Sequence, residues 1–249
     1  MNDSESPVQI KDEWTVHETY YDPSQIVTSG SNFMTGNGYL GYRGTFPEWS
    51  KDRYVGCVVS DTYDNADGKW KELCTVPNAL YARVFEGEHA ADLSESHTDY
   101  RHGVNVRHGR TFGGYTWITP SGSHIDISFE RFASYQSLHL IPQKITFHSD
   151  VETKITLRLG VDADIWSLHG NHFPQCTSFF DDHVYGTSCS TAENGLPVTV
   201  AGAYRLIGAS SESISGVNTE TDGSSEFVVL DISLPAGEPV MLEQVMAVY

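Results

Sequence analysis

The sequence predicts an all-β protein, built as a large antiparallel two-sheet β-sandwich with one or two short helices. Apolar and polar residues alternate over many short segments, which is the pattern of half-buried strands. No window of a dozen residues keeps apolar residues at the i, i+3 and i+4 spacing of an amphipathic helix. Turn residues recur at the short intervals that are typical of sandwiches. Two stacked sheets therefore explain the chain better than a helical or mixed fold.

The expected elements follow one another without a linker. Residues 1–10 are polar and acidic and are expected to form a flexible leader, and residues 11–249 a single domain. The predicted strands are residues 13–21, 54–60, 80–88, 116–119, 124–132, 138–147, 153–161, 198–201, 226–232 and 240–248. Residues 61–73 are expected to form an acidic loop. Short helices are predicted at residues 23–28 and 162–168.

Composition excludes several classes of partner. The 249 residues include 33 acidic and 15 basic ones, for a net charge of −18. Such a surface repels nucleic acid and anionic lipid. No apolar run is long enough to span a membrane, and the polar start is no signal peptide, so we expect a cytoplasmic protein without a membrane partner. The four cysteines, at 57, 74, 176 and 189, lack C-x-x-C spacing and are expected to be isolated reduced thiols.

One glycine-rich run, residues 32–48, stands apart from the rest. Its glycines at 36, 38 and 41 satisfy the dinucleotide-binding pattern G-x-G-x-x-G. That pattern requires a helix directly afterwards, and Gly44 and Pro47 oppose one. The glycines instead indicate a sharply bent, closely packed backbone.

The same run resembles a known family. The order Phe-x-x-Gly-Asn-Gly-Tyr-Leu-Gly-x-Arg-Gly-x-x-x-Glu over residues 33–48 is similar to the N-terminal signature of glycoside hydrolase family 65, with shorter matches at 76–78, 87–88 and 130–134. That family contains maltose, trehalose and kojibiose phosphorylases, related hydrolases and acid trehalases. The resemblance implies a sandwich of the galactose-mutarotase-like kind, followed by a large α-helical barrel. The chain is therefore expected to be the N-terminal part of a longer enzyme.

The resemblance places the catalytic acid and the phosphate-binding residues in the barrel, so we predict no catalytic residue in this chain. Residues of the run that are candidates for the substrate rim or the domain interface are Asn37, Tyr39, Arg43, Phe46 and Glu48. Structural roles compete with these: arginine and glutamate hold tight turns, and aromatic residues also fill cores. The carboxylates of Asp61, Asp64 and Glu130 are expected to be solvated or structural. The histidines at 89, 97, 102, 108 and 124 lack metal-binding spacing, so no metal is expected.

The function that the resemblance implies is support of the barrel and of a homodimer. The parent enzyme would use inorganic phosphate, and no other cofactor, to cleave an α-linked glucose disaccharide. Alternatives are a self-contained carbohydrate-binding module and a sugar epimerase with an acid–base pair. Which disaccharide is cleaved, and whether by phosphate or by water, depends on barrel residues. An exposed apolar patch is expected beside the glycine-rich run if it contacts a partner domain.

Overall fold

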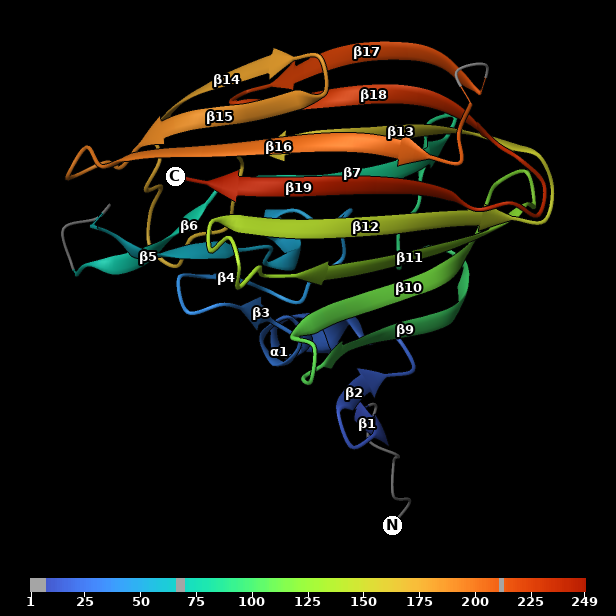
Figure 1. Ribbon diagram of the computed structural model, residues 1–249, viewed down its shortest axis with the longest axis horizontal. Helices are drawn as coiled ribbons and strands as arrows, with labels where there is room; N and C mark the ends of the chain where they lie inside the picture. Colours follow the sequence, from blue (N-terminus) through green and yellow to red (C-terminus); the bar gives the residue numbers. More distant parts are fainter. Residues whose placement is uncertain (1–7, 66–69, 211–212) are drawn as a thin grey trace.

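The computed structural model describes residues 8–65, 70–210 and 213–249 and consists of three antiparallel sheets (Figure 1). The largest has ten strands, in the order β1 Val8–Asp12, β2 Thr15–Glu18, β9 His97–Asn105, β10 Arg110–Ile118, β11 His124–Phe132, β12 Leu140–Ser149, β19 Val240–Val248, β16 Pro197–Ile207, β15 Val184–Ser190 and β14 Gln175–Asp181. A five-stranded sheet has the order β17 Ile214–Asp222, β18 Ser225–Leu234, β13 Thr153–Asp162, β7 Asn78–Glu86 and β8 His89–Ala90. A four-stranded sheet contains β3 Thr35–Gly36, β4 Leu40–Tyr42, β5 Cys57–Asp64 and β6 Glu72–Val76.

The main core lies between the ten-stranded and five-stranded sheets. Strand β11 alternates as predicted, with Ile125, Ile127 and Phe129 buried. Strand β13 contributes Leu157 and Leu159 in the same way. Because successive side chains of a strand point to opposite faces, this alternation commits one face of each strand to the core. The predicted antiparallel sandwich is confirmed.

Helix is confined to short segments, and one of the two predictions for it was right. A 3₁₀ turn, η1 Pro23–Gln25, leads into α1 Ile26–Asn32, so the helix predicted at residues 23–28 exists and runs further. A second 3₁₀ turn, η2, spans Lys51–Arg53. The helix predicted at residues 162–168 is wrong. There β13 continues to Asp162, whose carboxylate accepts a hydrogen bond from the amide of Asp164 in an irregular loop.

Several strands were missed because their sequences carry no apolar alternation. Strand β17 has no buried residue and is held by backbone pairing to β18. Strand β9 is polar and rich in histidine. Strand β5 begins within the strand predicted at residues 54–60, continues into the region predicted as an acidic loop and pairs there with β6, which was missed. Strands β14 and β15 were missed as well. Edge and polar strands depend on their neighbours, which single-chain patterns do not reveal.

The beginning of the chain is only partly described. Of the predicted leader, residues 1–7 lie outside the described residues, and residues 8–10 belong to β1, which pairs with β2. The assignment of residues 11–249 to one domain stays a prediction. Among the helices of the described residues, none has the length and apolar character needed to span a membrane.

The prediction of four isolated thiols is wrong for one pair. Cys176 of β14 and Cys189 of β15 lie directly opposite each other in the antiparallel register and form a disulfide. Cys57 and Cys74 are free and buried. Sequence spacing gave no sign of the bond, because only the register of two strands brings these sulfur atoms together.

Candidate functional site

The glycine-rich run forms β3, a tight turn and β4, and its asparagine holds that turn in place. The Oδ1 atom of Asn37 accepts hydrogen bonds from the amides of Tyr39 and Leu40, both at 3.0 Å. Its Nδ2 donates to the carbonyls of Ser134 at 2.7 Å and Leu138 at 2.9 Å. The left-handed φ of 87° at Gly38 explains a glycine beside it. Asn37 thus joins the run to the 134–138 loop, almost a hundred residues later.

Arg43 holds helix α1 against the run. Its guanidinium donates to the carbonyl of Val27 at 2.8 Å and to the hydroxyl of Ser31 at 3.0 Å. Partial burial lowers the pKa of Arg43. The backbone is closely packed here, because a Cβ on Gly44 would lie 2.5 Å from the carbonyl oxygen of Phe33. Arg43 therefore bonds α1 to the run from a partly buried position.

Phe46 and Glu48 are both buried at the end of the run. The ring of Phe46 packs against Trp49, His102 and Phe129, with ring centroids 4.9 to 5.2 Å apart. The carboxyl of Glu48 accepts a hydrogen bond from the hydroxyl of Tyr115 at 2.9 Å. Burial raises the pKa of Glu48 to about 7, against the lowering effect of that bond.

A buried polar network, which the sequence gave no reason to expect, connects the run to both large sheets. The guanidinium of Arg131, in β11, is fully buried and lies 4.1 Å from the ring centre of Tyr42. It donates to the carbonyl of Thr45 at 3.1 Å and through Nε to Gln143 Oε1 at 2.8 Å. Gln143 in turn donates to Gln244 Oε1 at 2.8 Å. Satisfied networks of this kind fix how strands are positioned.

A second buried cluster also escaped sequence analysis. His172 lies between two carboxylates, with Nδ1 3.2 Å from Asp64 Oδ2 and Nε2 2.5 Å from Glu72 Oε1. Asp64 further accepts hydrogen bonds from the amides of Glu193 and Asn194. These hydrogen bonds outweigh desolvation and lower the pKa of Asp64. The cluster ties the β5–β6 hairpin to two later loops, so Asp64 has a structural role.

The carboxylates considered as acids do not converge on one place. Asp61 is an exposed residue with a φ of 67°, and Glu130 forms exposed ion pairs with Arg110 and Lys144. Glu48 and Asp64 are buried in separate clusters. Within the described residues no group of three or more His, Cys, Asp or Glu side chains could hold a metal ion.

The sequence profile described as "Glycosyl hydrolase family 65, N-terminal domain" matches residues 16–249, nearly the whole chain. The chain belongs to this family. The resemblance predicted from residues 33–48 is therefore confirmed.

Several relatives of this chain are phosphorylases. A 1,2-α-glucosylglycerol phosphorylase of Bacillus selenitireducens is 37% identical over 236 residues, which are 95% of this chain and 30% of that protein. A nigerose phosphorylase of Lachnoclostridium phytofermentans is 32% identical over 167 residues, 64% of this chain and 21% of that protein. A solved structure, a putative kojibiose phosphorylase from human microbiome, superimposes with a TM-score of 0.84 at 18% identity over 98% of this chain and 33% of that one, which supports the fold. The chain thus spans at most about a third of these proteins.

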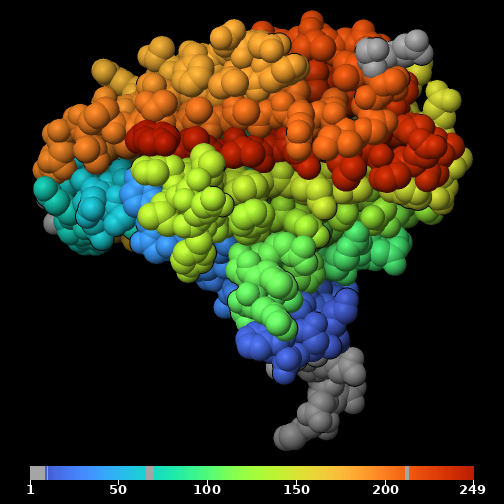
Figure 2. Space-filling view, viewed as in Figure 1, coloured from blue at the N-terminus to red at the C-terminus, as the bar shows by residue number. Residues whose placement is uncertain are grey.

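Of the five candidates in the family 65 run, Asn37, Phe46 and Glu48 are buried and Arg43 is partly buried. Tyr39 is partly buried as well and belongs to a cluster of rings. Its ring centre lies 4.5 Å from that of His139, which stacks on Tyr249 at 4.3 Å. Leu138 is 42% exposed and Tyr249 73% exposed. We call Tyr39, Leu138, His139 and Tyr249 the aromatic corner. In Figure 2 the yellow-green loop before β12 stands next to the red end of β19 at this corner.

Within the aromatic corner Leu138 and Tyr249 are exposed, while Tyr39 and His139 are partly buried. The contiguous apolar patch expected beside the run stays a prediction. Asn37, Arg43, Phe46 and Glu48 direct their polar or aromatic groups into the domain. Their predicted role at a substrate rim or domain interface stays a prediction as well.

Proposed function

We propose that this chain is the non-catalytic N-terminal domain of a family 65 α-glucoside phosphorylase. The observation that carries the proposal is that the polar side chains of the family signature are used inside the domain. Asn37 holds a turn, Arg43 holds a helix, and Glu48 is buried behind Tyr115. Glycosyl transfer needs a carboxylic acid within reach of the leaving oxygen and an open path for the attacking group. A buried Glu48 meets neither need.

A catalytic helical barrel of the same protein is the partner that we propose, together with a second copy of the protein in a homodimer. The length of the relatives supports this, since this domain spans only 30% of the glucosylglycerol phosphorylase. The aromatic corner offers the contact surface, because Leu138 and Tyr249 are exposed there and the ring of Tyr249, already stacked on His139, loses little conformational freedom on docking. The substrate is then an α-glucoside, and inorganic phosphate is the co-substrate, with no redox cofactor.

A turnover assay tests the non-catalytic role. The purified chain, incubated with kojibiose, nigerose or glucosylglycerol and phosphate, should release no glucose 1-phosphate. The protein expressed from the uninterrupted reading frame should release it from at least one of them. Turnover by the chain alone would overturn the non-catalytic role. A reading frame without a further domain would overturn the partnership.

The docking surface is tested in the intact protein. Leu138→Asp places a charge on the aromatic corner and should lower both Tm and phosphorolysis. Val217→Asp, on the exposed strand β17, is the matched control and should change neither. Equal effects of the two substitutions would remove the corner as the contact surface.

The cellular location is a separate proposal. We propose that the protein is located in the cytoplasm, as expected from the sequence. The Cys176–Cys189 disulfide argues against it, because disulfides persist mainly in oxidising compartments. Rapid alkylation of thiols in intact cells, followed by mass spectrometry, should find both cysteines alkylated if the protein is cytoplasmic.

A further inference from the structure

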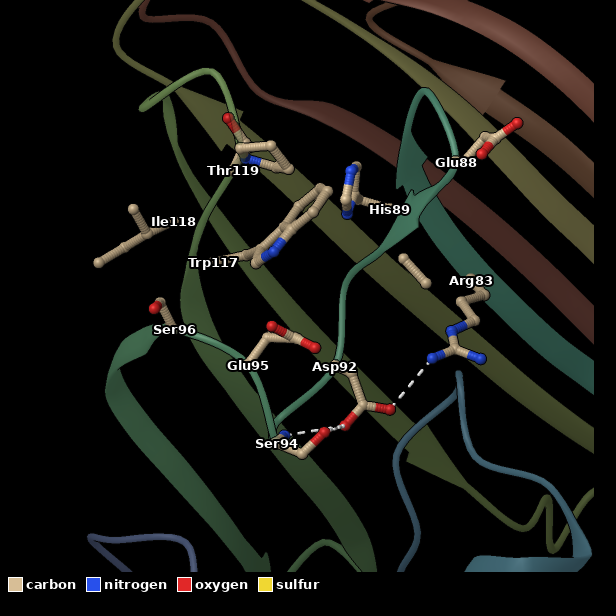
Figure 3. A pocket seen from close by; sticks show the side chains of 12 residues that line it. Arg83, Glu88, His89, Asp92, Ser94, Glu95, Ser96, Trp117, Ile118 and Thr119 are labelled. Carbon is tan, nitrogen blue, oxygen red and sulfur yellow. Dashed lines mark hydrogen bonds and ion pairs between the residues drawn. The ribbon is translucent and has the colours of Figure 1, made fainter.

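A cavity of about 570 Å³ opens where the edge of the five-stranded sheet meets the ten-stranded sheet (Figure 3). Strand β8 and the 92–96 segment form one wall, and the end of β10 with the turn after it forms the other. The volume lies within the range of small-molecule sites. No residue of the glycine-rich run lines it.

Two carboxylates, those of Asp92 and Glu95, lie together on one side of this cavity, and Glu88 lies at its far edge (Figure 3). Glu88 and Glu95 have no hydrogen bond or ion pair to any described residue through their carboxylates. Asp92 also lines the cavity and binds the amide and hydroxyl of Ser94 at 2.8 and 2.7 Å. Burial opposes the ionisation of Asp92, but these bonds and two nearby arginines outweigh it, so its pKa lies below the usual range. The cavity therefore carries three carboxylates.

Hydrogen-bond donors face the same space. Trp117 is only 2% exposed, and in Figure 3 its indole nitrogen faces the cavity, with the carboxylate of Glu95 below it. The guanidinium of Arg83 lines the cavity and donates to Asp92 Oδ2 at 3.0 Å, so its charge is already paired. The exposed imidazole of His89 stands opposite Trp117. Because the ring faces of Trp117 are packed in the core, only its indole N–H is available, as a hydrogen-bond donor. The imidazole of His89 is then the ring against which an apolar face of a ligand can pack.

The charges of this cavity differ from those of the neighbouring hollow on the ten-stranded sheet. There Glu130 lies 3.0 Å from Arg110 and 3.7 Å from Lys144, so each charge already has its partner. In the cavity, three carboxylates against the single Arg83 disfavour an anion such as phosphate. A cation would leave the indole N–H of Trp117 without an acceptor. A neutral ligand whose groups both donate and accept satisfies the two sides at once.

We propose that this cavity binds a neutral sugar ring, with one hydroxyl group donating to Glu95 and another accepting from the indole N–H of Trp117. One apolar face of the ring rests on His89. A single pyranose fills part of the volume and leaves room for a second unit, so a free monosaccharide and the end of an oligosaccharide share this chemistry. The site goes beyond the proposed function, because support of a barrel requires no ligand in this domain.

Isothermal titration of the intact chain tests the site, with methyl α-D-glucopyranoside and maltotriose as the two sugar sources. A shallow cavity of this kind should give a saturable Kd on the order of 1 mM. Glu95→Gln should raise Kd roughly tenfold, a loss of about 1.4 kcal/mol, and His89→Ala should also weaken binding. Glu130→Gln, in the neighbouring hollow, is the matched control and should leave Kd unchanged.

Three results would overturn the proposal: no saturable binding of either sugar, equal effects of Glu95→Gln and Glu130→Gln, or tighter binding of spermidine or inorganic phosphate than of both sugars. Tighter binding of maltotriose than of the monosaccharide identifies an oligosaccharide end as the preferred source. The titration involves no turnover. Its failure therefore leaves the phosphorylase assignment intact, and turnover by the isolated chain would leave the sugar site intact.

Discussion

Replacement of Glu48 by glutamine should remove a specific pH dependence of stability. Glu48 has a folded-state pKa of about 7 because of burial, against 4.5 when unperturbed. Below 4.5 the carboxyl is neutral in both states, so its contribution to stability is fully present. Between 4.5 and 7 the unfolded chain ionises while the folded chain keeps the proton, and stability is lost as the pH rises. At about 1.4 kcal/mol per pKa unit, the loss is about 3 kcal/mol above pH 7.

Glu48→Gln is neutral at every pH and keeps an oxygen to accept from Tyr115. The unfolding free energy of the natural chain minus that of the variant should therefore fall by about 3 kcal/mol between about pH 4.5 and pH 8. Urea denaturation followed by tryptophan fluorescence measures this difference. Both chains retain His102, whose pKa is lowered to about 3 by burial, so its contribution cancels. The control Glu238→Gln, at an exposed position, should give a flat difference.

The reasoning fails if the difference between the natural chain and Glu48→Gln stays constant over this range. It also fails if the variant is the less stable of the two at pH 8. Either result would mean that Glu48 is ionised in the folded domain at little cost.

Three further changes test the remaining contacts by the same urea assay. Asn37→Ala should destabilise the domain by roughly 2–4 kcal/mol, because four hydrogen bonds are lost and buried backbone groups stay unpaired. The control Asn218→Ala, at an exposed position, should cost less than about 0.5 kcal/mol. Equal effects would contradict the role of Asn37 in joining the run to the 134–138 loop. Gln143→Met should lower the free energy of unfolding by about 3 kcal/mol, because Arg131 keeps its buried charge and loses its side-chain acceptor. An unchanged free energy of unfolding would show that the network is dispensable. Reduction of the Cys176–Cys189 disulfide, whose cysteines are 13 residues apart, should lower the free energy of unfolding by about 3 kcal/mol. An unchanged urea midpoint in dithiothreitol would show that the disulfide does not contribute to stability.

The contacts within the glycine-rich run show how far sequence reasoning reached. The tight turn, the lack of a helix after it and the family all followed from residues 33–48, because glycine and proline restrict the backbone wherever they occur. The role of Asn37 did not follow, since its partners Ser134 and Leu138 are about a hundred residues away. The same holds for the packing of Tyr39 against His139, which depends on where β12 and β19 end.

By itself, the sequence determined the strands that alternate, the short helix, the family and the residues that form the bent run. The tertiary structure decided the contacts between distant strands: Arg131 with Gln143, His172 between Asp64 and Glu72, and the Cys176–Cys189 bond. The physical reason is that a period of two residues tells which face a side chain takes. Sheet order and register, which set the neighbour across the strand, come from the packing of the whole chain.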